Sequence, residues 1–265
     1  MKPAPFHYVR AATVDEAVDT LAAAGDEAKV LAGGQSLVPA LNMRLARPSV
    51  LVDLNRVAGL AEVTRENGSL AVGATARQAD GRLLAHPLLA EVLPYVGHVV
   101  TRNRGTVCGS IAHADPAAEL PLCLVLLDGS VRVRAVDGSR EIRAADFFLS
   151  HFTTALEPGE LVVETTWPLP EEGVGTGFCE VAQRRGDYAL CMAGAVARGD
   201  ELRVVVGSVV DRPTLLEVDP ERPGESAAAQ VEPWDTVHAS ASYLRHLVRV
   251  VVDRAVVQAR ERALA

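Results

Sequence analysis

Hydrophobic residues between positions 13 and 25 follow a helical period. A Thr-x-x-Glu pattern at Thr13 and Glu16 is typical of a helix capping box, in which the two side chains bond free N–H groups of the first turn. Gly25 is placed to end the helix, because glycine tolerates positive φ. The apolar stripe between these residues consists of Ala17, Val18, Leu21 and Ala22. The spacing therefore predicts an amphipathic helix between Thr13 and Gly25.

Two short strand-like runs flank a second and shorter helical pattern. The runs at 28–32 and 50–54 predict strands, and residues 37–45 predict a helix that stops before Pro48. Together with the first helix, these elements are expected to form a small N-terminal βαβ subdomain over residues 1–56.

The middle of the chain contains two strong hairpin signals. Asn67-Gly68 and Asp137-Gly138 each favour a tight turn between two strands. The strands expected on either side of them are 60–64 with 69–73 and 131–135 with 140–143. Further apolar patterns predict helices over 76–84, 88–93 and 116–120 and a strand over 161–167. These elements predict a second, mixed α/β subdomain over residues 57–172.

The last third of the chain is a run of strands followed by one long helix. After the polar linker 171–175, the expected strands are 178–181, 189–197 and 202–210. A proline-rich connection over 212–223 and a helix from about 242 to 263 complete this part. The pattern predicts a C-terminal domain over residues 173–265, with a three-stranded antiparallel sheet and helices. The fold class is therefore α+β, without the long βα alternation of a Rossmann domain.

Composition narrows the possible partners and the compartment. The net charge is −8 without a basic stripe, which argues against nucleic-acid binding. There is no run of about 18 apolar residues and no apolar leader, so we expect neither a membrane span nor secretion. The four cysteines lack paired metal-ligand spacing, which favours buried thiols in a reducing cytoplasm and predicts no metal site.

Two glycine loops carry the candidate chemistry. Ala32-Gly33-Gly34-Gln35-Ser36 lies between a predicted strand and a predicted helix, and a second loop, Arg102–Ser110, lies about seventy residues later. Glycine lets the backbone approach a ligand closely, and N–H groups at a helix start favour phosphate. Alone, each loop could be an ordinary tight turn. As a pair they predict two backbone clamps on one dinucleotide, although neither fits G-x-G-x-x-G.

Several ordered motifs resemble one known family. They are Phe6–Ala11, Leu31–Ser36, Arg102–Leu120, Leu156–Glu164 and Arg184–Ala189. Their order and intervals resemble the FAD-binding medium subunit of the molybdenum hydroxylases, which include xanthine dehydrogenase and aerobic carbon monoxide dehydrogenase. The resemblance covers nearly the whole chain. It implies a two-part FAD-binding domain followed by a C-terminal domain of sheet and helices.

The resemblance also assigns roles to individual residues. The two loops would hold the FAD diphosphate, and Asp115 and Glu119 would bond ribityl or ribose hydroxyls. Leu161 would lie near the adenine, and Tyr188 near the flavin. His113 is either near the reactive edge of the flavin or a structural histidine. The implied cofactor-binding set is Leu31, Ala32, Gly33, Gly34, Gln35, Ser36, Thr101, Thr106, Gly109, Ser110, His113, Asp115, Glu119, Leu161 and Tyr188.

One position departs from the family pattern. The second loop of the family reads Thr-x-Gly-Gly, and here Cys108 replaces the first glycine. A side chain at positive φ would cost about 1–2 kcal/mol, whereas at negative φ it would cost little. We expect negative φ and a passive residue rather than a reactive thiol, because Gly109 is retained.

The function implied by the resemblance is electron transfer. Nothing in the sequence indicates substrate chemistry of its own, such as a nucleophile elbow or clustered metal ligands. The chain is therefore expected to pass electrons from [2Fe–2S] clusters through FAD to NAD or another acceptor. Its partners would be a small [2Fe–2S] subunit and a large molybdopterin subunit, in a dimer of heterotrimers. The alternatives are a stand-alone flavoprotein oxidase or reductase and a binding module that has lost FAD.

Overall fold

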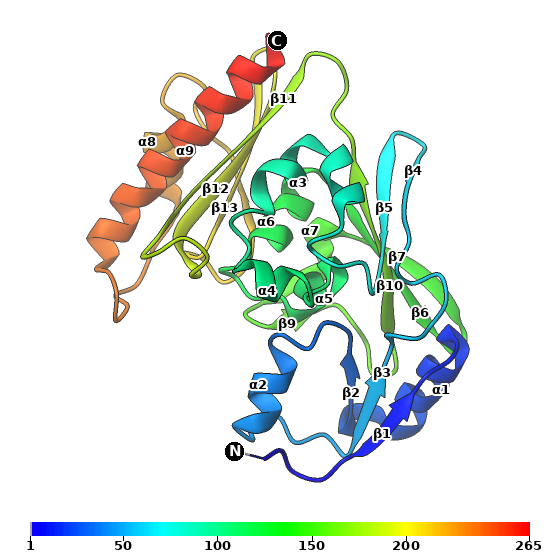
Figure 1. Cartoon of the computed structure of the whole chain (residues 1–265). Coiled ribbons are helices and arrows are strands. Elements are labelled where there is room, and N and C mark those ends of the chain that lie inside the picture. Colours follow the sequence, from blue (N-terminus) through cyan, green and yellow to red (C-terminus); the bar gives the residue numbers. More distant parts are fainter. Residues whose placement is uncertain (1) are drawn as a thin grey trace.

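The computed structural model describes residues 2–265 and begins with a small parallel sheet, which we call the N-terminal sheet (Figure 1). Its strand order is β1-β3-β2, and both pairings are parallel. The elements are β1 (His7–Arg10), α1 (Val14–Ala24), the 3-10 helix η1 (Gly25–Glu27), β2 (Ala28–Leu31), α2 (Leu37–Asn42) and β3 (Val50–Asp53). The predicted strands are confirmed, whereas β1 was not predicted because its mostly exposed residues give no hydrophobic signal.

The predicted capping box closes α1. The N–H of Glu16 donates to Thr13 Oγ1 at 3.1 Å, and the Glu16 carboxylate accepts from the N–H of Ala12 at 2.7 Å. Gly25 ends the helix with φ +54°. The second helix is shorter than predicted, since α2 ends at Asn42 and Arg44 takes φ +59°.

A five-stranded antiparallel sheet, the central sheet, follows with the order β4-β5-β10-β6-β7. Its strands are β4 (Val63–Glu66), β5 (Ser69–Gly73), β6 (Ser130–Ala135), β7 (Gly138–Arg143) and β10 (Leu161–Pro168). The other elements of this part are η2 (Gly81–Ala85), α3 (Pro87–Val92), α4 (Val99–Arg102), α5 (Val107–His113), α6 (Glu119–Leu126), α7 (Ala144–Phe147), β8 (Phe148–Ser150) and β9 (Thr153–Thr154). Both hairpins form as predicted, although β4 begins at Val63 rather than at residue 60.

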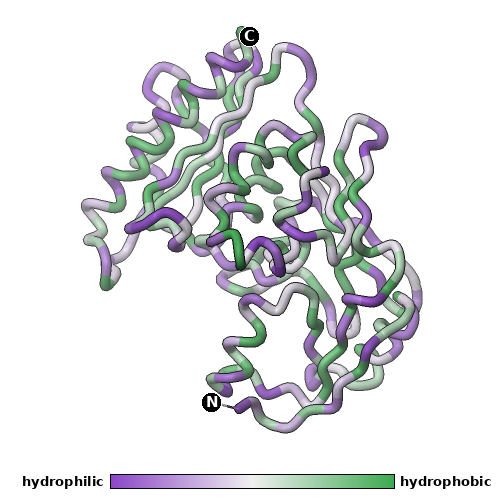
Figure 2. Tube along the Cα trace, in the orientation of Figure 1, coloured by the Kyte–Doolittle hydropathy of each residue, from purple (hydrophilic) through white to green (hydrophobic). Residues whose placement is uncertain are grey.

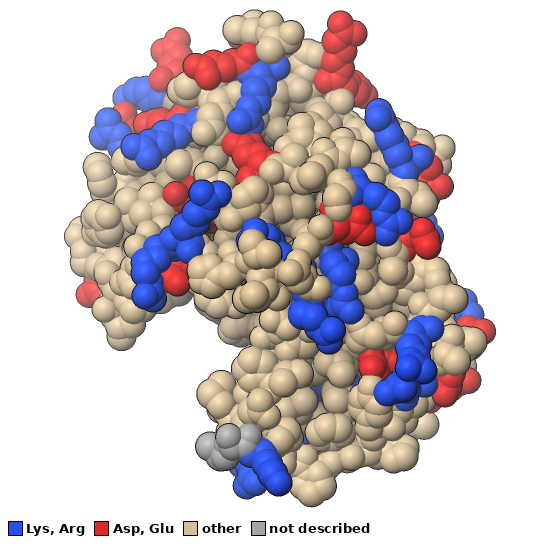
Figure 3. Space-filling model, in the orientation of Figure 1, with Lys and Arg blue, Asp and Glu red and all other residues tan. Residues whose placement is uncertain are grey.

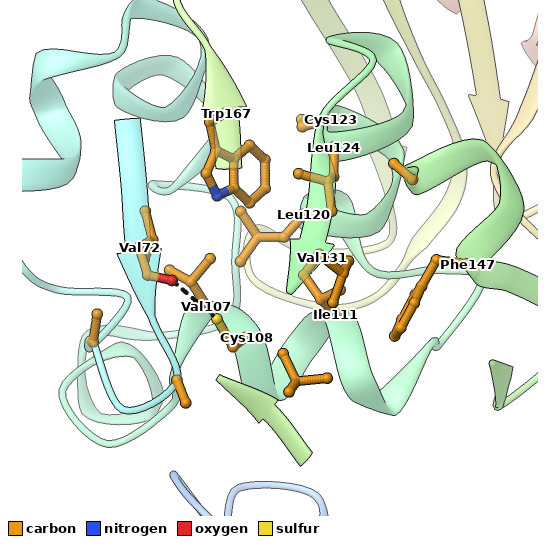
Figure 4. Packing of buried hydrophobic residues seen from close by; sticks show 14 of the residues in the cluster. Val72, Val107, Cys108, Ile111, Leu120, Cys123, Leu124, Val131, Phe147 and Trp167 are labelled. Atoms are coloured by element: carbon orange, nitrogen blue, oxygen red, sulfur yellow. Dashed lines mark hydrogen bonds between the residues drawn. The ribbon is translucent and has the colours of Figure 1, made fainter. Parts of the chain in front are cut away.

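The main core lies between the central sheet and α5 and α6 (Figure 4). Every residue of α6 is buried, so this helix has no polar face. Trp167 is fully buried, and its indole N–H donates to Thr165 Oγ1 at 2.9 Å, which satisfies its polar atom. The core therefore fixes α5, and with it the second glycine loop, against the sheet.

Two predicted helices of this part are wrong. Residues 76–84 do not form a continuous helix, because their backbone pairs with the second glycine loop: Gln78 N–H donates to the Gly105 carbonyl at 2.9 Å, and Arg77 forms a bridge with Thr106. Only η2 remains of that prediction. Helix α6 begins at Glu119 rather than at Pro116, since Asp115 Oδ1 accepts from the N–H of Ala117 at 2.9 Å and holds a turn there.

The C-terminal sheet contains four strands rather than the three predicted. Its elements are β11 (Val174–Ala182), β12 (Ala189–Arg198), β13 (Glu201–Gly207), β14 (Thr214–Leu216), α8 (Pro223–Gln230) and α9 (Ala241–Ala263). The added strand β14 is a short edge strand inside the predicted connection 212–223. Strand β11 begins at Val174 and so includes the end of the predicted linker.

The C-terminal sheet is covered on both faces. One face joins the main core through Phe178, Met192 and Val205, and the other packs against α9 (Figures 1 and 2).

Within residues 2–265, no helix is both long and apolar enough to cross a membrane. On the face drawn in Figure 3, basic and acidic side chains are interspersed.

Two glycines let α9 approach β11 very closely. A Cβ at Gly175 would overlap the carbonyl oxygen of Ala259, and a Cβ at Gly177 would overlap that of Ala255. The small residues on both elements thus set the distance between helix and sheet. Glycine in a strand interior typically marks this kind of close backbone approach.

Gly177→Ala is expected to destabilise the chain by about 1–3 kcal/mol, because the added methyl group must push α9 away from the sheet. Urea denaturation measures the change in the free energy of unfolding. Gly81→Ala is the matched control, since position 81 has open space and needs no positive φ. Equal stability of the two variants would show that α9 does not depend on this contact.

Candidate functional site

A cleft of 870 Å³ lies between the N-terminal sheet, the central part and the C-terminal sheet. This volume is near the upper end of the range for cofactor sites, about 300–1,000 Å³. Figure 3 shows the surface hollowed between the N-terminal part and the rest of the molecule. The site is therefore assembled from segments that are far apart in the sequence.

The cleft brings together nearly all the predicted site residues. Those that line it are Ala32, Gly33, Gly34, Gln35, Ser36, Thr101, Thr106, Gly109, Ser110, His113, Asp115, Glu119, Leu161 and Tyr188. Leu31 lines instead a neighbouring pocket of 530 Å³ on the other side of the first loop.

The first glycine loop turns the chain from β2 into α2. Gly34 takes φ +72°, a conformation that side chains rarely adopt, and its carbonyl accepts from the N–H of Val38 at 2.9 Å. Gln35 folds back so that its Nε2 donates to the Gly33 carbonyl at 3.2 Å. The turn is thus held by local bonds that leave the intervening amides unused.

The second loop packs directly against the first. Thr106 caps α5, with its Oγ1 accepting from the N–H of Gly109 at 3.1 Å. A Cβ at Gly33 would lie 2.5 Å from the carbonyl oxygen of Arg104 and 2.7 Å from the Cα of Gly105. Gly33 is therefore required because two backbones touch there, and not because of its own φ.

The free amides of the first loop fit the diphosphate of FAD. The N–H groups of Gly33–Ser36 donate to no acceptor within residues 2–265, although they border the cleft. Buried or partly buried N–H groups are normally paired, so a row of free ones marks a place for an acceptor. The hydroxyl-bearing residues Ser36 and Ser110 also line the cleft. This donor set matches the charged oxygens of a diphosphate.

An acidic pair lies farther along the cleft. Asp115 is half-buried, and Glu119 is only 5% exposed. Burial, together with the carboxylates of Glu180 and Asp115, raises the pKa of Glu119 to about 8. Glu119 is therefore mostly protonated at neutral pH and can both donate and accept a hydrogen bond. Sugar or ribityl hydroxyls need partners of this kind.

Aromatic groups stand at the mouth of the cleft. The side chain of Tyr188 is 62% exposed. Partial burial of its hydroxyl and the nearby Asp115 carboxylate raise the pKa of Tyr188 to about 12, while Ser36 acts in the opposite direction. The ring of His113 packs against Phe152, with centroids 5.0 Å apart. Tyr188, which directly precedes β12, thus lies close to Ser36 of the first loop and to Asp115.

Cys108 is a passive core residue, as expected. It lies inside α5 with helical backbone, and its Sγ donates to the Val72 carbonyl at 3.3 Å (Figure 4). Burial raises the pKa of the Cys108 thiol to about 12. Cys108 borders the cleft but is only 2% exposed and bonds within the core, and the helical backbone at this position accepts a side chain without strain.

Several residues of the cleft were not predicted. Gln78 is 7% exposed and lines the cleft, and its Oε1 is buried without a partner among the described residues. Phe152 lines the cleft with φ +52°. Neither belongs to a recognisable motif, and only the fold brings them to the site.

No group of three or more His, Cys, Asp or Glu side chains able to hold a metal ion occurs in residues 2–265.

Fold and cleft together define a protein with one large cleft that is bordered by two glycine-containing loops in direct contact. Residues 4–170 match the family model described as the FAD-binding domain in molybdopterin dehydrogenase. The chain belongs to this family, and the predicted family and its cofactor, FAD, are confirmed. It is an FAD-binding medium subunit of the molybdenum hydroxylase family and thus part of an oxidoreductase.

Known relatives match over almost their full length. The chain is 40% identical to the 6-hydroxypseudooxynicotine dehydrogenase complex subunit alpha of Paenarthrobacter nicotinovorans, covering 99% of this chain and 97% of the relative. It is 34% identical to the nicotine 6-hydroxylase medium subunit of the same organism, covering 98% and 99%.

Solved structures share the complete fold. Quinoline 2-oxidoreductase from Pseudomonas putida 86 contains a chain 33% identical to this one, with a TM-score of 0.91 and 100% of both chains covered. Carbon monoxide dehydrogenase from Hydrogenophaga pseudoflava contains one that is 28% identical, with a TM-score of 0.92 and 99% of both covered. The predicted α+β class is confirmed.

Gly33→Ala is expected to lower FAD affinity about tenfold or more, because the methyl group meets the backbone of the second loop and moves the two donor sets apart. Fluorescence titration with FAD measures the effect. Gly68→Ala is the control: it introduces a side chain at φ +73° in open space, so it strains a hairpin without touching the cleft. Full FAD content in purified Gly33→Ala would show that the contact between loops is dispensable.

Glu119 is expected to make stability fall with rising pH. Because its pKa is raised in the folded state, its stabilising contribution is complete below about pH 4.5 and is lost as pH rises through about 8. The loss is on the order of 2–4 kcal/mol. Glu119→Gln should flatten this slope in denaturation of the FAD-free chain between pH 6 and 9. An unchanged slope would mean that other groups set it.

Proposed function

We propose that the chain passes electrons from [2Fe–2S] clusters of a partner subunit through FAD to NAD or another acceptor. The observation that carries the proposal is a complete cofactor cleft in a chain that matches relatives named medium subunit or medium chain over nearly their whole length. FAD supplies the redox chemistry, and the protein supplies binding, orientation and electrostatics.

The residues of the cleft suggest how FAD would be held. The free amides of Gly33–Ser36 and the start of α5 would bind the diphosphate. Asp115 and the protonated Glu119 would bond ribityl or ribose hydroxyls, and Leu161 would pack at the adenine end. Tyr188 and His113 would lie near the flavin. These assignments are supported by the position of each residue in one cleft.

The partners would be a small subunit with [2Fe–2S] clusters and a large molybdopterin-binding subunit, assembled as a dimer of heterotrimers. The names of the relatives support a multi-subunit assembly, because they describe a complex subunit, a medium subunit and a medium chain. The four cysteines are free thiols, which fits a reducing compartment such as the cytoplasm.

We also propose domain limits close to residues 56 and 172. The support is that the N-terminal, central and C-terminal sheets exchange no strand with one another among residues 2–265.

The isolated full chain is expected to bind one FAD non-covalently, to be reduced by dithionite, and to oxidise no purine, aldehyde or N-heterocycle without its partners. Acid precipitation followed by absorbance of the supernatant measures free FAD, and dye reduction measures turnover. Addition of the large and small subunits should restore substrate oxidation. Robust turnover of an organic substrate by the chain alone would favour a stand-alone flavoprotein oxidase or reductase.

A further inference from the structure

A chain of hydrogen bonds runs along the first glycine loop, and its members Tyr8, Asp53 and Asn55 border the neighbouring 530 Å³ pocket rather than the cofactor cleft. Asn55, just after β3, donates from Nδ2 to the carbonyl oxygen of Ala32 at 2.9 Å. Its backbone N–H donates to Asp53 Oδ1 at 2.9 Å, and Asp53 Oδ2 accepts from the hydroxyl of Tyr8. Asn55 is thus anchored to two strands of the N-terminal sheet while it holds the first loop.

Arg77 continues this chain to the second glycine loop. One terminal nitrogen, Nη2, donates to Asn55 Oδ1, and the other, Nη1, donates to the carbonyl oxygen of Arg104. The backbone of Arg77 also forms a bridge with Thr106. One guanidinium therefore contacts the side chain that holds the first loop and the backbone of the second. Its planar fork suits two acceptors in fixed directions.

Charged groups on both sides of Arg77 act on its guanidinium. Partial burial and the Arg104 cation lower the pKa of Arg77, and the Asp53 carboxylate opposes this effect. Burial alone would raise the pKa of Asp53, but hydrogen bonds from Tyr8 and Asn55 lower it overall. Asp53 therefore remains ionised, and its negative charge favours the charged form of Arg77.

Neither Arg77 nor Asn55 is among the residues that line the cofactor cleft. We propose that Arg77 and Asn55 form a tie that couples the two FAD-binding loops, so that Arg77 is a positioning residue for the diphosphate site. The inference rests on FAD binding and is independent of the electron-transfer role. It extends the contact at Gly33, where the same two loops meet.

The tie has a thermodynamic consequence. A diphosphate bound by both loops requires them at one fixed separation, and any freedom in that separation must be removed on binding. With the tie in place, this ordering is already complete in the FAD-free chain. Without it, each loop keeps its own donors, but the two sets no longer have a fixed spacing.

The test compares FAD affinity in Arg77→Met, Arg77→Lys and the control Arg65→Met, an exposed arginine on β4. Arg77→Met should weaken FAD binding about tenfold or more, and Arg77→Lys should not restore it, because an ammonium lacks the planar fork. The control should bind like the parent. Parent-like affinity in Arg77→Met would overturn the tie, and so would full rescue by lysine, because the tie needs two nitrogens of one fork on two acceptors.

A second measurement needs no FAD. In the FAD-free chain, Arg77→Met should increase hydrogen exchange in segment 34–42, where the amides of Val38 and Ala40 bond the first loop at 2.9 and 3.2 Å. Arg77 has no hydrogen bond to this segment, so the change must pass either through Asn55 or through the contact between Arg104 and Gly33, and the Asn55→Ala background separates these two routes. In the Asn55→Ala background, adding Arg77→Met should change the FAD affinity and the exchange rate of segment 34–42 by less than about twofold each. Unchanged exchange in this segment, or additive losses of affinity, would contradict the proposal.

Discussion

The direct contact of two backbones at Gly33 is the constraint on which the site depends. The first loop belongs to a parallel sheet near the N-terminus, and the second belongs to a helix fixed by the main core. These parts have separate sheets, but their loops touch each other because Gly33 has no Cβ. A cofactor bound by both loops needs N–H donors that point toward one place. The two loops can supply such donors only if their backbones lie in contact.

Sequence periodicity predicted the elements whose stability is local. The capping box at Thr13, the two hairpins and the long α9 all formed, because their signals come from residues within one or two turns. The edge strand β1 and the segment around Arg77 were missed for the opposite reason. Their conformation is fixed by partners far along the chain, namely Val50 and Gly105, which no local pattern reveals.

The candidate site likewise contains residues that the sequence could reveal and residues that it could not. Residues inside ordered motifs, such as the two glycine loops, could be found from their intervals, and they line one cleft. Gln78 and Phe152 have no motif and enter the cleft only through the fold. The substitution at Cys108 shows the limit of pattern matching, since its effect depended on the backbone φ and on the direction of the side chain.

The C-terminal part of the chain lines one side of the cleft, so the cofactor-binding unit extends beyond the first two parts of the chain. Gly186, Asp187 and Tyr188 line the cleft, and Gly186 packs so closely that a Cβ there would lie 2.8 Å from the imidazole of His98. The family match ends at residue 170, before these three residues. The smallest piece able to enclose the cleft is therefore larger than the segment that matches the family model, because it must include the residues between β11 and β12.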